Sequence, residues 1–253
     1  MNAPPRRRFE RPIRFVRNRF SPESHLGLHL TIGIFIVVFS AWCFSEIAEQ
    51  LGPSSGVVAV DESVINWFHE RAEPPLTTAA RAISLLGSVA FLIFASVACA
   101  AAFAWRRAWD WLLALSITML GGSLLNILLK HFFQRQRPVL ENPLVTLTSF
   151  GFPSGHTMGA TVFYGLLALI AAQALIGRRS RFLALCLAVV LVAAIGTTRI
   201  YLGAHFLSDV LAALAAGIVW LTFSWTTVEA FRMRRKRAGA RNEDAASLDR
   251  PAV

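Results

Sequence analysis

Six long apolar stretches constrain what this chain can fold into more than any other feature of the sequence. They lie near residues 26–46, 84–105, 109–130, 155–176, 182–202 and 208–231. A hydrocarbon core about 30 Å thick is crossed by ~20 helical residues, which is the length of each stretch. Because lipid offers the backbone no hydrogen-bond partners, each stretch is expected to be a helix. The sequence therefore predicts an all-α polytopic membrane protein, a six-transmembrane-helix bundle.

Composition supports a membrane protein and weighs against other classes. Charged residues make up only 16% of the chain, whereas about 25% is usual in a soluble domain. The net charge of +10 comes from basic residues at the termini and between the apolar stretches, so nucleic acid is not a predicted partner. Cys43, Cys99 and Cys186 lie inside apolar stretches without a CxxC pair, which supports neither a disulfide framework nor a zinc site.

The distribution of basic residues predicts the orientation. Most of the 25 Lys and Arg residues fall on one side of the predicted membrane, in the two terminal segments and after the second and fourth apolar stretches. By the positive-inside rule this side is cytoplasmic, which places both termini there. We expect a multi-pass protein of the plasma (inner) membrane, with the opposite helix ends on the outer, periplasmic or extracellular side.

The chain is expected to divide into three parts. A basic N-terminal segment (1–25) precedes the membrane domain (26–231), and a basic cytoplasmic tail (232–253) follows, with disorder predicted after Arg237. Apolar residues at helical spacing within 9–20 indicate a helix lying in the membrane interface, with a plain basic tail attracted to anionic lipid as the alternative. A second short interfacial helix is expected around 60–72.

Three polar stretches on the outer side carry residues that topology does not require. The first reads KHFFQRQRP and closes the third apolar stretch. While the helix persists, Lys130 and Arg137 share one face, and Pro138 predicts that the chain turns at Arg137. Two long cationic side chains there can converge on one small anion. Snorkelling membrane anchors are the alternative explanation.

The second stretch, FPSGHT, comes immediately before the fourth apolar stretch. Ser154 is suited to cap the helix, and Gly155 lets a ligand approach the backbone. Free N–H groups and the positive dipole end make such a helix start an anion site. His156 then lies in the first turn, facing the bound group. The alternative is an ordinary cap beside a partly exposed histidine.

The third stretch, TRIYLGAHFLSD, joins the fifth and sixth apolar stretches. His205 and Asp209 are four residues apart, a spacing that places side chains on one helical face. A carboxylate bonded to one ring nitrogen fixes the tautomer and leaves the other nitrogen free to attack. A structural His–Asp pair is the alternative. With Arg199, these residues complete a set suited to holding and transferring a phosphoryl group.

Together the three motifs resemble the type 2 phosphatidic acid phosphatase superfamily, whose pattern is K-x6-R-P, P-S-G-H and S-R-x5-H-x3-D. They appear here as Lys130…Arg137-Pro138, Pro153-Ser154-Gly155-His156 and Thr198-Arg199…His205…Asp209. One departure is Thr198, where the family usually has serine; the hydroxyl is retained.

The resemblance implies a role for each candidate residue. His205 would attack phosphorus, Asp209 would orient His205, and His156 would protonate the leaving oxygen and later activate water. The phosphate oxygens would be held by a shared set of donors, namely Lys130, Arg137, Ser154, Gly155 and Arg199. No metal and no other cofactor is expected, and the sequence offers no carboxylate cluster for Mg²⁺.

The predicted function is therefore a membrane lipid phosphatase that forms a phosphohistidine. Undecaprenyl diphosphate, phosphatidylglycerol phosphate, phosphatidic acid and a lipid A phosphate are the candidate substrates, and the first two are favoured by the resemblance. The predicted partners are this lipid and the bilayer, with no protein partner. A lipid phosphotransferase using the same site and a non-catalytic phospholipid-binding or carrier protein are the alternatives; six spans disfavour a vanadate haloperoxidase.

Overall fold

The computed structural model describes residues 25–52, 55–140, 144–145 and 147–248, and all regular secondary structure within them is helical. The helices are α2 (His25–Glu49), α3 (Gly56–Glu70), α4 (Pro74–Leu85), α5 (Val89–Trp105), α6 (Trp109–Phe133), α7 (Gly155–Ala174), α8 (Arg178–Tyr201) and α9 (Leu207–Leu248).

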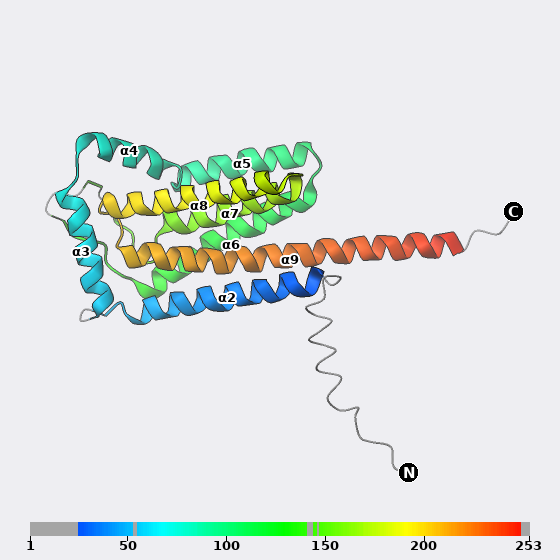
Figure 1. Ribbon diagram of the computed structural model, residues 1–253, viewed down its shortest axis with the longest axis horizontal. Helices are drawn as coiled ribbons and strands as arrows, with labels where there is room; N and C mark the ends of the chain where they lie inside the picture. Colours follow the sequence, from blue (N-terminus) through cyan, green and yellow to red (C-terminus); the bar gives the residue numbers. More distant parts are fainter. Residues whose placement is uncertain (1–24, 53–54, 141–143, 146, 249–253) are drawn as a thin grey trace, which may run out of the picture.

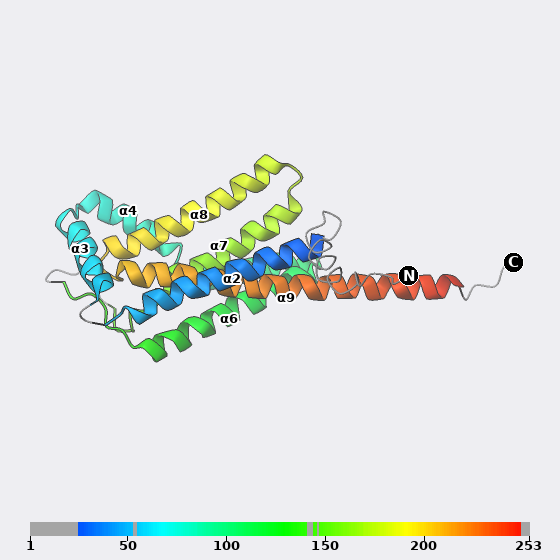
Figure 2. The ribbon, with the colours of Figure 1, turned by 60° about the horizontal axis from the view of Figure 1, so that its bottom comes forward.

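The long helices run side by side, and α3 lies across one end of the bundle (Figure 1). Helix α9 packs against α2, α6 and α7, and α7 also packs against α8, an arrangement that Figure 2 shows from a second side. The connections from α6 to α7 and from α8 to α9 both lie at the α3 end. Helix α2 begins and α9 ends at the opposite end, so the two ends of the described chain leave the bundle on the same side.

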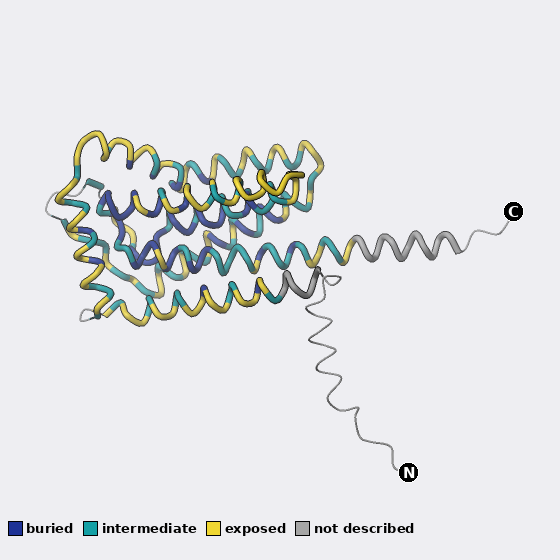
Figure 3. The backbone as a smooth tube through the Cα atoms, in the orientation of Figure 1, coloured by how far each residue is buried: buried dark blue, intermediate teal, exposed yellow. Residues whose placement is uncertain are grey.

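The predicted spans correspond to helices of the structure. Within the described part of the chain, five helices are each long and apolar enough to cross a membrane, and α4 with α5, bent by 42°, forms a sixth candidate span. Large apolar side chains such as Phe35, Phe94 and Leu187 are exposed. Figure 3 shows exposed positions along the outer helices of the bundle. Exposed apolar faces of this extent suit a lipid environment.

The second span is broken where the sequence predicted one continuous helix from residue 84. Helix α4 ends at Leu85, and Ser88 caps α5 by accepting a hydrogen bond from the Phe91 N–H at 3.2 Å. A Cβ atom on Gly87 would lie 3.2 Å from the His156 carbonyl oxygen and 2.6 Å from an Ile195 methyl group. The glycine thus allows the break to pack directly against the first turn of α7.

Two helix ends differ from the sequence predictions. Helix α6 ends at Phe133, and Gln134 adopts a left-handed conformation with φ of 46°, so the prediction that the chain turns at Arg137 was wrong. Helix α9 continues to Leu248, whereas disorder was predicted after Arg237; alanine, arginine and glutamate in this segment favour helix.

The two predicted interfacial helices have different outcomes. Helix α3 forms where a short helix was expected around 60–72 and buries Asp61 and Ile65. The helix predicted within 9–20 lies outside the described residues.

Close packing between α6 and α9 depends on a glycine. The Trp220 indole donates to the Thr118 carbonyl oxygen at 2.9 Å, and a Cβ atom on Gly121 would lie 2.0 Å from that indole ring. We expect Gly121→Ala to destabilise the folded protein by about 1–3 kcal/mol, because the indole must leave its position. Thermal unfolding in detergent measures the effect. Gly56→Ala is the matched control, since nothing lies within 4 Å of its Cβ position; equal stability of the two variants would refute the packing argument.

Candidate active site

A tight turn between α8 and α9 positions His205. Gly203 has a φ of +69°, in the left-handed region that favours glycine. The N–H groups of Ala204 and His205 both donate to the Arg199 carbonyl oxygen, at 3.0 and 3.2 Å. His205 therefore lies just before α9 rather than on it, contrary to the shared helical face from which its pairing was predicted. Its side chain is almost fully buried.

Asp209, in the first turn of α9, still reaches His205. Its Oδ2 atom lies 3.4 Å from His205 Nδ1 and accepts the Phe206 N–H at 3.0 Å. On the other side of the ring, Arg137 Nη1 lies 3.1 Å from His205 Nε2. A guanidinium can only donate, so Nε2 accepts and the ring proton is assigned to Nδ1, facing Asp209. The lone pair of Nε2 consequently points toward Arg137.

The surroundings keep the His205 imidazole neutral. Burial lowers its pKa to about 4, against the opposing effect of the Asp209 carboxylate. Cations at Arg137 and Lys130 lower it further. At neutral pH the ring therefore has an unprotonated nitrogen available for attack.

Lys130 and Arg137 converge although they do not share a helix face. Both donate to the Phe150 carbonyl oxygen, Lys130 Nζ at 2.5 Å and Arg137 Nη2 at 3.4 Å. Arg137 also donates to the carbonyl oxygens of Ala204 and Ser149, each at 2.6 Å. Burial lowers the pKa of the Arg137 guanidinium, while the charge of Asp209 raises it. The early end of α6 brings the two cations to one point.

The start of α7 is held against α9. The Ser154 N–H donates to the Asp209 carbonyl oxygen at 3.1 Å, and Ser154 Oγ accepts from the Thr157 N–H at 3.4 Å, which confirms the predicted N-cap. Phe152 is fully buried, and the Phe152–Pro153 peptide is cis. A Cβ atom on Gly155 would lie 3.8 Å from Lys130 Cε, so the backbone at the helix start is close to this cation.

Arg199 and His156 complete the cluster. Arg199 is buried and donates to Ser84 Oγ at 2.7 Å, while its Nε has no protein hydrogen-bond partner. His156, in the first turn of α7, lies close enough to the cations Arg199, Arg137 and Lys130 for their charges to act on it. All eight predicted site residues thus lie at the α3 end of the bundle, on or beside α6, α7, α8 and α9.

Two residues that the sequence analysis did not assign join this cluster. Arg135 Nη1 donates to Asp209 Oδ1 at 2.7 Å, and Arg135 Nη2 donates to Asp61 Oδ2 at 2.8 Å. Arg135 is one of the few basic residues on the predicted outer side, which was an available signal. Asp61 carried no comparable signal, because its partners come from elements distant in the sequence.

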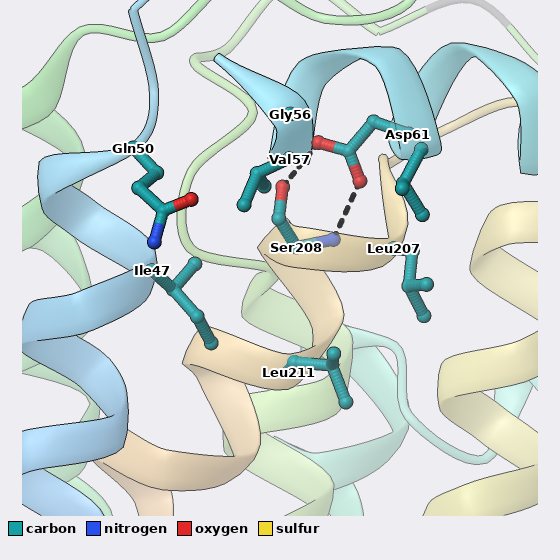
Figure 4. Close-up of a pocket in the computed structure, with 9 residues that line it drawn as sticks. Ile47, Gln50, Gly56, Val57, Asp61, Leu207, Ser208 and Leu211 are labelled. Carbon is teal, nitrogen blue, oxygen red and sulfur yellow. Dashed lines mark hydrogen bonds between the residues drawn. The ribbon is translucent and has the colours of Figure 1, made fainter.

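Two cavities border the cluster. One of about 260 Å³ lies between α2, α3 and α9, and its polar lining residues are Gln50, Asp61 and Ser208 (Figure 4). The other, of about 200 Å³, is lined in part by Arg137, Gly203 and Ala204. Neither of these two cavities is lined by His156 or His205.

Comparison with known proteins identifies the family. Residues 111–233 match the PAP2 superfamily. The chain is 33% identical over 168 residues to phosphatidylglycerophosphatase B of Bacillus subtilis, covering 66% of this chain and 82% of that protein. The chain belongs to the PAP2 superfamily. It is also 32% identical over 169 residues to decaprenylphosphoryl-5-phosphoribose phosphatase of Mycobacterium tuberculosis, covering 64% of this chain and 85% of that protein.

The fold agrees with this PAP2 assignment. The crystal structure of a transmembrane PAP2 type phosphatidylglycerolphosphate phosphatase from Bacillus subtilis matches with a TM-score of 0.71 and 30% identity, covering 79% of this chain and 97% of that one. The protein is therefore a multi-pass membrane enzyme, a hydrolase that acts on lipid phosphates, as the sequence predicted.

Proposed function

We propose that the protein hydrolyses a phosphomonoester or diphosphate of a membrane lipid through a phosphohistidine at His205. One observation carries the proposal. The Nδ1 side of the ring faces the Asp209 carboxylate at 3.4 Å, while Nε2 faces Arg137 at 3.1 Å. A neutral imidazole held by a carboxylate and directed at a cationic anion site is arranged for nucleophilic attack on a phosphoryl group.

The first step transfers the phosphoryl group to the enzyme. His205 Nε2 attacks phosphorus, and the bond between phosphorus and the lipid-side oxygen breaks. His156, which takes up a proton once the anionic substrate offsets the nearby cations, donates that proton to the oxygen as it leaves. Asp209 stabilises the positive charge that develops on His205.

The second step releases phosphate. His156, now unprotonated, takes a proton from a water molecule that attacks phosphorus. The phosphorus–nitrogen bond breaks, its electron pair returns to His205 Nε2, and the starting protonation states are restored.

The cations would hold the phosphoryl oxygens during both steps. Arg137 would exchange its contact with His205 Nε2 for a phosphoryl oxygen, and Arg199 has its Nε free of protein partners. Lys130, Ser154 and the Gly155 N–H supply the remaining donors. A low-dielectric site strengthens each of these contacts as charge builds up in the transition state.

The position of the site in the bundle supports a reaction on the outer side of the membrane. The site lies at the end of the bundle opposite the two ends of the described chain, and the positive-inside rule assigns the chain ends to the cytoplasm. The reaction would then take place at the outer surface of the plasma (inner) membrane. Phosphatidylglycerol phosphate, undecaprenyl diphosphate and phosphatidic acid place their phosphates at such a boundary, and relatives are named for phosphatidylglycerophosphate and a decaprenyl phosphoribose phosphate.

Phosphate release from a panel of these lipids, with purified protein in detergent and EDTA present, tests the proposal. We expect turnover of at least one lipid with phosphate appearing in water, because the chemistry described uses protein side chains alone. Folded protein that releases phosphate from none of them, or that requires added Mg²⁺, would refute it. Transfer of label from the lipid to an added lipid or sugar alcohol in preference to water would favour the phosphotransferase.

A further inference from the structure

A buried cluster of charges lies behind the His205–Asp209 pair, on the side away from the phosphoryl site. Arg135, from the segment after α6, donates to Asp209 Oδ1 at 2.7 Å and to Asp61 Oδ2 at 2.8 Å. The side chains of Asp61, Asp209 and Arg135 are 1%, 0% and 11% exposed. Two almost fully buried carboxylates thus share one guanidinium.

Helix α3 is fixed to the start of α9 by the same carboxylate. Asp61 Oδ1 accepts the Ser208 N–H at 2.8 Å, and Asp61 Oδ2 accepts the Ser208 hydroxyl, as Figure 4 shows. Arg135 Nη1 also donates to Ser208 Oγ at 2.6 Å. Ser208 is adjacent to Asp209, so α3 holds the first turn of α9 in the position from which Asp209 reaches His205.

The charges of this cluster do not cancel. One guanidinium and two carboxylates leave a net charge of about −1 next to the imidazole. With Asp61 absent, Asp209 and Arg135 would form a neutral pair, and Asp209 would stabilise a positive His205 less well. Burying three charges is costly, and a well-packed apolar substitute is often as stable. Stability alone therefore does not account for this cluster. Such clusters beside a site are candidates for a functional role.

We propose that Asp61 and Arg135 are positioning residues that set the orientation and the effective charge of Asp209. Arg135 bridges the two carboxylates. Because its guanidinium also binds Asp61, it neutralises the charge of Asp209 only in part. Asp209 can then hold the Nδ1 side of His205 as an anion. This inference rests on the proposed function, since it assigns the two residues to the phosphohistidine step.

Three variants test it in full-length protein with dioctanoyl phosphatidic acid as the probe. Asp61→Asn and Arg135→Gln should each lower kcat by about 10-fold to 100-fold with little change in KM, since a small displacement of a reacting group has effects of this order. The double variant restores the wild-type net charge of the cluster. It should therefore lose less activity than the two single effects multiplied together.

The pH dependence of kcat/KM separates this role from a purely structural one. Its acid limb, the fall in kcat/KM at low pH, reports protonation of His205. Asp61→Asn removes a negative charge, which favours neutral His205 and moves the limb to lower pH. Arg135→Gln removes a positive charge and moves it to higher pH. The other charged and titratable groups around the two histidines stay the same in both variants, namely Lys130 on α6, Arg137 after it, His156 on α7, Arg199 on α8 and Asp209 on α9.

Glu62→Gln is the matched control, because it makes the same charge change at an exposed position next to Asp61 on α3; it should leave kcat and the acid limb unchanged. If Arg135→Gln does not fold, the limb shift of Asp61→Asn against Glu62→Gln carries the test of charge, and the kcat of Arg135→Lys tests the bridging geometry. The inference would be overturned if the acid limbs of the two single variants moved in the same direction. It would also be overturned if the variants gave less folded protein but kept the wild-type kcat and the wild-type acid limb. Wild-type protein that forms no phosphoenzyme would instead overturn the proposed function.

Discussion

Replacing His205 with alanine should reduce phosphate release by about 10⁴-fold or more on every lipid that the wild-type protein hydrolyses. The reason is that removing the nucleophile from a unit of cooperating groups removes nearly all of the chemical acceleration. Lipid binding should persist, because Lys130, Arg137 and Arg199 remain in place. Phosphate release and equilibrium binding of a labelled lipid phosphate measure the two properties separately.

Controls keep this result interpretable. His205 is buried, so the alanine variant leaves a cavity; His205→Gln retains more of the volume and should be equally inactive. His131→Ala removes an exposed histidine at the same end of the bundle and should remain active. Turnover within about tenfold of wild type in either folded His205 variant would remove this residue from its assigned role.

Replacing His156 with glutamine should lower kcat on lipid phosphates by about 10²-fold to 10⁴-fold, the usual contribution of a general acid–base group. The effect should depend on the leaving group. With p-nitrophenyl phosphate the leaving oxygen needs no proton, so the first step should proceed in the variant while the hydrolysis step remains slow. Stopped-flow absorbance should then show a burst of about one p-nitrophenolate per active site before slow turnover.

The burst is the informative feature of this experiment. Wild-type protein on the same substrate provides the reference, and His205→Ala should show no burst at all. If His156→Gln slows p-nitrophenolate release as strongly as it slows release from lipid, then His156 does not protonate the leaving group.

The sequence predicted the spans, and it predicted that three separated motifs would meet at one end of the bundle, because both depend on strong local signals. Long apolar runs specify helices in lipid, and the three motifs lie at helix ends on one side of the membrane. Ser154 illustrates this, since its cap on α7 could be predicted from the residues that follow it.

The internal geometry of the site depended on tertiary contacts that local patterns do not contain. Lys130 and Arg137 meet at the Phe150 carbonyl oxygen because α6 ends at Phe133, not because they share a helix face. His205 precedes α9 and reaches Asp209 through the turn at Gly203. The spacing of four residues predicted the contact between His205 and Asp209 correctly, although it assumed that both residues lie on one helix.

The break at Gly87 and the role of Asp61 were beyond prediction for the same reason. Gly87 matters because of the close approach of His156 and Ile195 from α7 and α8. Asp61 is buried by Arg135 and Ser208, which lie 74 and 147 residues further along the chain. Periodicity and motif spacing carry no information about contacts at such separations.

Trapping the phosphorylated protein tests the central claim most directly. The His156→Gln variant is mixed with p-nitrophenyl phosphate labelled in its phosphate, because that leaving group needs no proton from residue 156. The mixture is quenched in base during the first turnover and digested for mass spectrometry. We predict one phosphoryl group per protein, attached to His205, stable in base and released in acid. A burst of p-nitrophenolate in the first turnover with the label on another residue, or on no residue, would contradict the account.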